Sequence, residues 1–312
     1  MQTLDAFDKR FPTDHECKLY LKQMRWPNAV RCPRCKSEKV FELPARPFNW
    51  VCKSGTTSND PHTGKPVTCD KKNGYRFSII THTIFENTKR PLRSWFKIAF
   101  LMLVSKKGVS ALQLHRMMYG SKHLNNYHTT WYQCMRLRAA MKDSEWEQLM
   151  GVVEIDEVYL GGLERNRHKS QRKLAGQRGV AGKTEVIGAI ARKGNVVCQM
   201  VEDADFHTYD DFVRKTVSGR VDLIATDESF RYRHLNRMGF KHDFVKHSAD
   251  EFVRGKVHTQ TIESFWSLLR RGIMGSYHKI SKDYLPLYLS EFTYRHNRRN
   301  ADDPFAELIS NV

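Results

Sequence analysis

The stretch Val152-Val153-Glu154-Ile155-Asp156-Glu157-Val158-Tyr159 decides how the second half of this chain folds. It alternates apolar and acidic residues, is rich in β-branched side chains and leads to Gly161-Gly162, a pattern that predicts a buried β-strand. Glu154 and Asp156 are two residues apart, so they share one face of that strand. Buried carboxylates are costly unless they are paired, protonated or bound to metal. The pattern therefore indicates either a site that uses these acids or, more simply, solvated acids at a sheet edge.

Two later stretches supply further acids. Residues 221–228 predict a second apolar strand that runs into Asp227. Residues 261–270 predict an amphipathic helix, with an apolar stripe and with Glu263 at the border of its polar face. Between Asp227 and Glu263 lie 35 residues. Arg270 is seven residues beyond Glu263 and points in nearly the same direction, so it is placed to touch a DNA phosphate.

Four of the seven cysteines fall in one region of the chain. Cys32-Pro33-Arg34-Cys35 is a knuckle that aims two thiolates at one cation, and Cys52 and Cys69 can complete a tetrahedral zinc site. The 16 residues between Cys52 and Cys69 are rich in Gly, Ser, Thr, Asn and Pro, so we expect an inserted loop. His62 lies in that loop and is the alternative fourth ligand. The competing interpretation is that Cys52 and Cys69 are ordinary thiols, but the Cys32–Cys35 knuckle favours a zinc site, with Cys69 preferred to His62 as the fourth ligand.

Charge is distributed unevenly along the 312 residues. The net charge is +18, of which residues 1–150 contribute +14, with 26 Lys and Arg against 12 Asp and Glu. This excess favours a polyanion such as double-stranded DNA, held mainly by the first half, because +14 over 150 residues is more than solubility alone needs. We find no signal peptide, and the apolar run at residues 98–104 is too short to span a membrane. An odd number of cysteines without an export signal favours a reducing compartment, here the cytoplasm.

The region between the cysteines and the strands is expected to be helical. Residues 95–105 predict an apolar helix, residues 110–119 a short serine-capped helix, and residues 127–141 a basic helix that carries Arg136 and Arg138. A short capped helix, a turn and a basic helix are typical of a helix-turn-helix, although ordinary packed helices give the same pattern. We therefore expect Arg136 and Arg138 to contact DNA.

From residue 151 onward the sequence predicts a mixed sheet. After the first strand we expect a hairpin, a helix, the Asp227 strand, a further strand and two helices, over residues 185–201, 208–217, 221–228, 240–245, 261–270 and 284–297. This order is typical of an RNase H-like α/β domain. The expected division is an N-terminal helical segment, a zinc ribbon, a helical DNA-binding region and an RNase H-like catalytic domain, over residues 1–30, 31–88, 89–150 and 151–312.

Residues 165–183 separate the first strand from the hairpin and contain seven basic residues and no acids. A segment of this composition does not bury a core, so we expect a mobile loop. Because it leaves the strand that carries Asp156, we expect Arg172, Lys173 and Arg178 to clamp the DNA backbone. The alternative is a solvated tether.

These residues together resemble a known family. The two strand acids and the helix glutamate at this spacing are similar to those of DDE transposases and integrases. Nearly the whole chain resembles the prokaryotic DDE insertion-sequence transposases of the zinc-ribbon group, which are related to eukaryotic Merlin elements. The matching stretches are Phe11-Pro12-Thr13, Arg25-Trp26-Pro27, Cys32-Pro33-Arg34-Cys35, Thr83-Ile84-Phe85, Pro91-Leu92, Glu154-Ile155-Asp156-Glu157, Val257-His258-Thr259, Ile262-Glu263-Ser264-Phe265-Trp266-Ser267-Leu268-Leu269-Arg270 and Arg295-His296-Asn297-Arg298-Arg299. The long gap between Cys52 and Cys69 departs from the pattern of the group.

The resemblance implies a reaction and its residues. Asp156, Asp227 and Glu263 would bind two Mg²⁺ or Mn²⁺ ions per active site, with Asp156 as the bridging ligand, and one structural Zn²⁺ would occupy the ribbon. His258 also matches the group, and its role stays open between metal site, DNA contact and helix cap. The implied activity is binding of terminal inverted repeats, DNA cleavage and strand transfer into target DNA, in a homodimer or higher oligomer.

Two other functions compete with transposition. One is a DNA-binding regulator with an inactive RNase H-like half, which has no physical need for three convergent acids. The other is an RNase H-like nuclease or resolvase, which does not need a zinc ribbon and a helix-turn-helix to recognise DNA ends. The transposase interpretation accounts for both halves of the chain.

Overall fold

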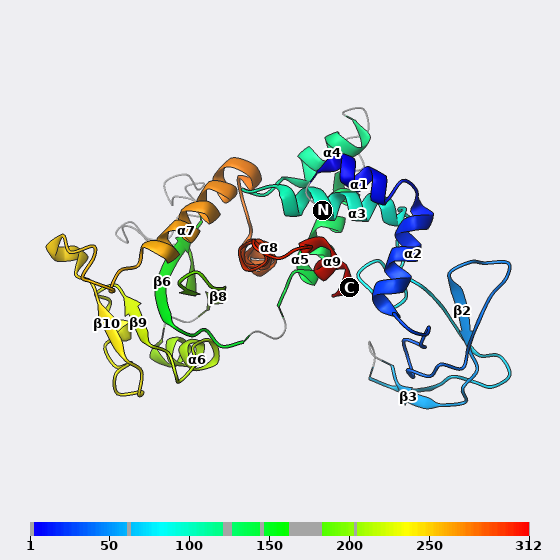
Figure 1. The fold of residues 1–312 in the computed structure, drawn as a ribbon, viewed down its shortest axis with the longest axis horizontal. Coiled ribbons are helices and arrows are strands. Elements are labelled where there is room, and N and C mark those ends of the chain that lie inside the picture. Colours follow the sequence, from blue (N-terminus) through cyan, green and yellow to red (C-terminus); the bar gives the residue numbers. More distant parts are fainter. Residues whose placement is uncertain are drawn as a thin grey trace, which may run out of the picture. The chain divides into compact units, whose positions relative to one another are not determined.

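The computed structural model describes residues 3–60, 64–120, 127–143, 147–161, 183–202 and 205–311. The chain divides into two compact units (Figure 1). The first contains residues 1–104, 111–140 and 301–312, and the second contains residues 105–110 and 141–300. Among the described residues, no helix is long and apolar enough to cross a membrane.

An aromatic core holds the helices of the first unit together. These helices are α1 (Leu4–Arg10), α2 (Asp14–Arg25), α3 (Leu92–Val104), α4 (Ala111–Tyr119), α5 (Tyr127–Ala140) and α9 (Pro304–Ser310). Phe11 contacts the rings of Phe7, Phe96 and Phe305 at centroid distances of 5.2 to 5.6 Å. Helix α2 is capped at its start, because the Thr13 hydroxyl accepts a hydrogen bond from the amide of His15. The final helix therefore packs with the N-terminal ones, a long-range contact that no local pattern announces.

A small antiparallel sheet in the same unit surrounds the cysteines. It consists of β1 (Val40–Glu42), β2 (Asn49–Cys52) and β5 (Tyr75–Ser78), in the order β1-β2-β5. Between β2 and β5, the strands β3 (Thr57–Asn59) and β4 (Pro66–Thr68) pair with each other. The inserted loop expected between Cys52 and Cys69 thus contains a hairpin, formed by the described parts of that stretch. Threonine at both Thr57 and Thr68 favours the pairing, since their hydroxyls lie 2.8 Å apart.

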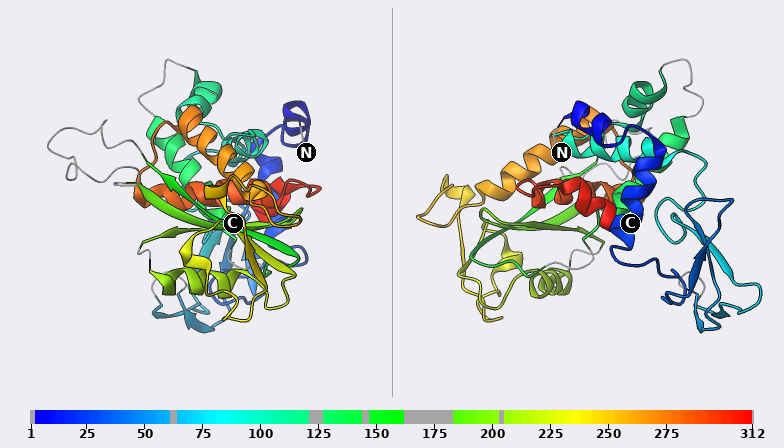
Figure 2. Two further views of the ribbon diagram at one scale, coloured as in Figure 1. Left: turned by 90° about the vertical axis from the view of Figure 1, so that its left-hand side faces the viewer. Right: turned by 45° about the vertical axis from the view of Figure 1, so that its right-hand side comes forward.

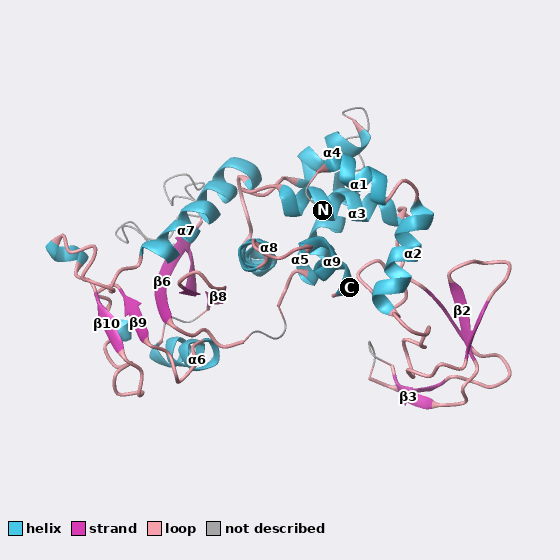
Figure 3. Ribbon diagram, in the orientation of Figure 1, coloured by secondary structure: helices cyan, strands magenta, loops and turns pink. Residues whose placement is uncertain are grey.

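The second unit is built on the predicted mixed sheet (Figure 3). Its strands are β6 (Val152–Leu160), β7 (Thr184–Ala191), β8 (Val196–Val201), β9 (Leu223–Thr226) and β10 (His242–Phe244), and the spatial order is β10-β9-β6-β7-β8. β6 is central, antiparallel to β7 and parallel to β9. The predicted hairpin is confirmed as β7 and β8, with Lys193 in the left-handed conformation at its turn. The decisive stretch is therefore an interior strand and not a sheet edge.

Helices cover both faces of this sheet (Figure 2). Helix α6 (Phe206–Thr216) packs against one face, which includes Ile155. Helices α7 (Gln260–Gly272) and α8 (Leu285–Asn297) pack against the other, which includes Val158. A close approach of α7 depends on Gly188 of β7, since a Cβ at that position would lie 2.6 Å from the Trp266 ring. Because Gly188 pairs with Asp156, α7 is held directly over the strand that carries the acids.

Candidate functional site

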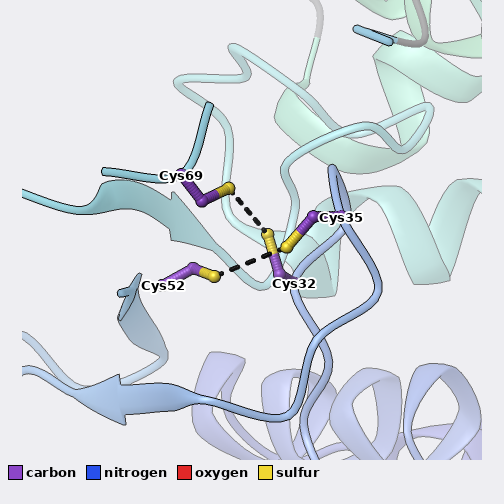
Figure 4. Close-up of side chains that lie close together, drawn as sticks. All are labelled: Cys32, Cys35, Cys52 and Cys69. Atoms are coloured by element: carbon purple, nitrogen blue, oxygen red, sulfur yellow. Dashed lines mark hydrogen bonds between the residues drawn. The ribbon is translucent and has the colours of Figure 1, made fainter. Parts of the chain in front are cut away.

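Four cysteines converge in the first unit (Figure 4). The Sγ atoms of Cys32 and Cys69 lie 3.9 Å apart, and those of Cys35 and Cys52 lie 3.6 Å apart. Four thiolates at about 2.3 Å from one tetrahedral zinc ion would be separated by about 3.8 Å. The four sulfurs therefore fit Zn²⁺. Cys69 takes the fourth position, as preferred from the sequence, while its rival His62 lies outside the described residues.

The thiols differ in acidity. Burial raises the pKa of Cys32 to about 11 and also raises the pKa of Cys69. Burial acts on Cys35 in the same direction, but hydrogen bonding to Ser54 and to the backbone outweighs it and lowers the pKa to about 7. Zinc binds thiolates, so the cation would supply the charge that these buried sulfurs need in order to ionise.

A cluster of carboxylates forms where β9 ends in the second unit. Oxygen atoms of Asp156, Glu157 and Asp227 lie within 4.8 Å of one another. The cluster follows from the strand register. Glu154 of β6 pairs with Ala225 of the parallel strand β9, so two residues further along, Asp156 and Asp227 come side by side. Glu263 lies outside this closest set, but its charge acts on Asp156. The structure thus brings together the two predicted strand acids and adds Glu157, for which no role was predicted.

Electrostatic repulsion marks this cluster. Burial, followed by the negative charges of Glu157, Asp227 and Glu263, raises the pKa of Asp156 to about 7. The pKa of Glu157 is also raised, mainly by burial, and the hydrogen bond from Tyr232 only partly offsets this shift. Carboxylates that repel one another in this way provide oxygen ligands for a hard divalent cation.

Two polar side chains, Tyr232 and Arg231, contact the Glu157 carboxylate. The Tyr232 hydroxyl donates a 2.6 Å hydrogen bond to Glu157 Oε1. Arg231 Nη1 lies 3.5 Å from the same oxygen and 2.7 Å from Glu185 Oε1. Sequence reasoning missed these partners because they lie on a short turn after Asp227, with no periodic pattern of their own.

Glu154 is buried on the α7 face of β6. It is 0% exposed and accepts hydrogen bonds from Arg192, from the Thr261 amide and hydroxyl, and from the Ile262 amide. His258 Nδ1 lies 3.2 Å from Glu154 Oε1. The role of His258, left open between metal site, DNA contact and helix cap, stays a prediction. Glu154 is therefore paired and is not a ligand of the carboxylate cluster.

The basic residues predicted to contact DNA lie in four different settings. Arg138 is 1% exposed, with Nη1 3.6 Å from the Met135 sulfur, so its burial argues against the predicted contact with DNA. Arg136 is half-buried and donates hydrogen bonds to the carbonyls of Glu86 and Thr83, which gives it a structural role. Arg270 is exposed on the last turn of α7 and is available to a phosphate. The predicted loop contacts Arg172, Lys173 and Arg178 lie outside the described residues.

Comparison with known proteins accounts for both clusters. Residues 148–297 match the model of an ISXO2-like transposase domain, and residues 12–55 match that of a transposase zinc-ribbon domain. The chain belongs to the prokaryotic insertion-sequence transposases of the zinc-ribbon group. The matched ranges contain the carboxylate cluster and three of the four cysteines, so both centres lie within domains characteristic of transposases.

Two individual proteins are similar to this transposase. A protein of Halobacterium salinarum, described as an uncharacterized protein in transposable element ISH50, is 28% identical over 305 residues, or 92% of each chain. A simian T-cell lymphotropic virus intasome in complex with PP2A regulatory subunit B56 gamma is 11% identical and covers 58% of this chain and 67% of that chain, with a TM-score of 0.28.

Proposed function

We propose that this transposase binds the terminal inverted repeats of an insertion sequence, cleaves the DNA at those ends and joins them to target DNA. The observation that carries the proposal is the meeting of Asp156, Glu157 and Asp227 at the end of β9, within reach of the charge of Glu263. The strand order, with β6 central between β7 and β9, supports an RNase H-like catalytic domain.

The residues of the cluster fit divalent cations, because carboxylate oxygens are the ligands that Mg²⁺ and Mn²⁺ prefer. Two such ions, when bound, activate a water or 3′-hydroxyl nucleophile and stabilise the leaving oxygen. Asp156, Asp227 and Glu263 would hold these ions. Tyr232 and Arg231 keep Glu157 oriented, and α7 keeps Glu263 beside the strand.

Basic residues would hold the DNA. The exposed Arg270 lies on the same helix as Glu263, so a phosphate near the cleaved bond would meet it. The +14 charge of residues 1–150 would bind the repeat, with the zinc ribbon as a folded module of that half. Two ends must be processed for one element, which favours a homodimer or higher oligomer as the active form.

The test uses the DNA that flanks the gene. Purified protein is incubated with a duplex containing the flanking inverted repeat, a target plasmid and Mg²⁺, and the products are separated by electrophoresis. We expect nicking at the repeat and covalent joining to the plasmid. Cleavage without joining would favour a nuclease or resolvase, and binding without cleavage would favour an inactive regulator.

A further inference from the structure

We propose that Glu154 is a positioning residue for the metal-binding acids. In this proposal Glu154 caps helix α7 from the neighbouring strand, and the Thr259 hydroxyl, which makes no capping bond of its own, holds Glu263. The inference rests on the proposed role of Glu263 and extends it, because it identifies what fixes that carboxylate beside Asp156.

Glu154 is a buried charge whose needs are fully met. Arg192 Nε lies 2.7 Å and the Thr261 hydroxyl 2.9 Å from Glu154 Oε1. The other oxygen accepts from the amides of Thr261 at 2.7 Å and Ile262 at 3.1 Å. An isolated buried carboxylate is strongly destabilising, so this set of donors must form for the strand and the helix to pack.

The capping of α7 is divided between two residues in an unusual way. An N-cap threonine ordinarily accepts hydrogen bonds from the first free amides of its own helix. Thr259 occupies the N-cap position, yet its side chain makes no such bond. Those amides, on Thr261 and Ile262, are bound by Glu154 instead. The Thr259 hydroxyl donates a 2.6 Å hydrogen bond to Glu263 Oε1.

The same carboxylate ties down the segment that enters α7. Arg192 uses Nη2 to donate to the carbonyl of His258 at 3.1 Å, while its Nε binds Glu154. Glu154 also precedes Asp156 by two residues on one face of β6, and Thr261 precedes Glu263 by two residues on α7. One buried group therefore links the strand that carries Asp156 to the turn that carries Glu263.

The experiment measures Mn²⁺ binding to the full-length, zinc-loaded protein by electron paramagnetic resonance, and DNA cleavage in parallel. Glu154→Gln and Thr259→Val should each raise the Mn²⁺ dissociation constant about 10- to 100-fold, the usual effect of removing a residue that orients a metal ligand. Thr259→Ser keeps the hydroxyl and should restore wild-type affinity. Glu291→Gln is the matched control, since Glu291 is 0% exposed, accepts from Tyr277 and lies 3.6 Å from Arg295, two partners that lie outside the N-terminal turn of α7.

The possible outcomes distinguish a failure of the positioning role of Glu154 from a failure of the proposed metal-binding role of Glu263. Glu291→Gln should lower the melting temperature without changing the Mn²⁺ affinity. If Glu154→Gln and Thr259→Val behave like that control, or if Thr259→Ser is as weak as Thr259→Val, the positioning role is overturned while the active-site assignment stands. If Glu263→Gln binds Mn²⁺ and cleaves DNA like the wild type, the assignment of Glu263 fails, and the positioning role fails with it.

Discussion

Asp227 lies beside Asp156 because the strands β9 and β6 are parallel and Ala225 pairs with Glu154. Each acid is two residues beyond its member of that pair. β9 ends at Thr226, so Asp227 leaves the strand where Asp156 continues along β6. A shift of one residue in this pairing would turn one of the acids to the other face of the sheet. The geometry of the cluster thus depends on strand pairing more than on any local turn.

Removal of one charged ligand at a time should stop the chemistry. Asp156→Asn, Asp227→Asn and Glu263→Gln keep the side-chain shape, so cleavage should fall by about 100-fold or more with repeat binding intact. The measurement combines gel-based cleavage with a binding titration. Asp222→Asn, at an exposed position before β9, is the control and should be as active as the wild type. Near-normal strand transfer in any one of the three variants would remove that residue from the site.

Zinc should co-purify with the protein at about one ion per chain. Cys32→Ser and Cys69→Ser should each lose the ion and make the ribbon sensitive to protease, because metal binding supplies folding energy to such modules. Elemental analysis and limited proteolysis report the two effects. His62→Ala should keep its zinc. The reverse pattern, with zinc lost from His62→Ala and kept in Cys69→Ser, would show that the fourth ligand is wrongly assigned.

Gly188→Ala should disturb the site without touching a carboxylate. The added methyl would meet the Trp266 ring at 2.6 Å and push α7 away from β7. Overpacking of this kind costs about 1–3 kcal/mol, and the shift of α7 should also weaken Mn²⁺ binding. Thermal melts and Mn²⁺ titration test both effects. Gly219→Ala, with open space around the new methyl, should match the wild type in both.

The acidity of Asp156 predicts how stability changes with pH. Its pKa in the folded protein is raised to about 7, mainly by burial, so ionisation of Asp156 opposes folding. The penalty is absent below about pH 4, grows as pH rises and is complete above about pH 7. In buffer without added Mg²⁺ or Mn²⁺, Asp156→Asn should therefore melt at a higher temperature than the wild type at about pH 8. The difference should shrink as the pH is lowered toward about 5, and an unchanged difference would contradict the assignment.

Local patterns in the sequence predicted most of the second unit. The alternation in β6, the Lys193 turn and the apolar stripe of α7 each depend on neighbouring residues, and each appears where expected. Cys69 lies with the other three cysteines in one cluster, and its assignment as the fourth zinc ligand stays a prediction. The acids Asp156 and Asp227 met as predicted because strand register follows from the same apolar pattern.

Contacts that depend on tertiary packing were not predictable in this way. Glu154 looked like a partner of Asp156 because the two share a face of the strand. In the structure its carboxylate instead accepts hydrogen bonds from Arg192 and from the first turn of α7. Arg138 looked like a DNA contact because a basic residue on a helix is usually exposed, yet the fold buries it. The periodicity of apolar residues predicts which face of a helix or strand is buried. Which residues pack on that face depends on distant parts of the chain.

Neutralising Arg136 should affect the stability of the protein, whereas neutralising Arg172, Lys173 and Arg178 should affect the salt dependence of DNA binding. Arg136→Ala should lower stability by about 2 kcal/mol, because its guanidinium donates to two backbone carbonyls, and should leave the salt dependence of DNA binding unchanged. The triple change of Arg172, Lys173 and Arg178 to alanine should weaken strand transfer and flatten the salt dependence, because a protein that neutralises fewer phosphates releases fewer counterions. Repeat preference should stay as it is in the triple variant, since phosphate contacts carry little sequence information. Binding titrations at several salt concentrations, with thermal melts, distinguish the two sets. A triple variant with normal joining and a normal salt slope would mean that residues 165–183 are only a tether.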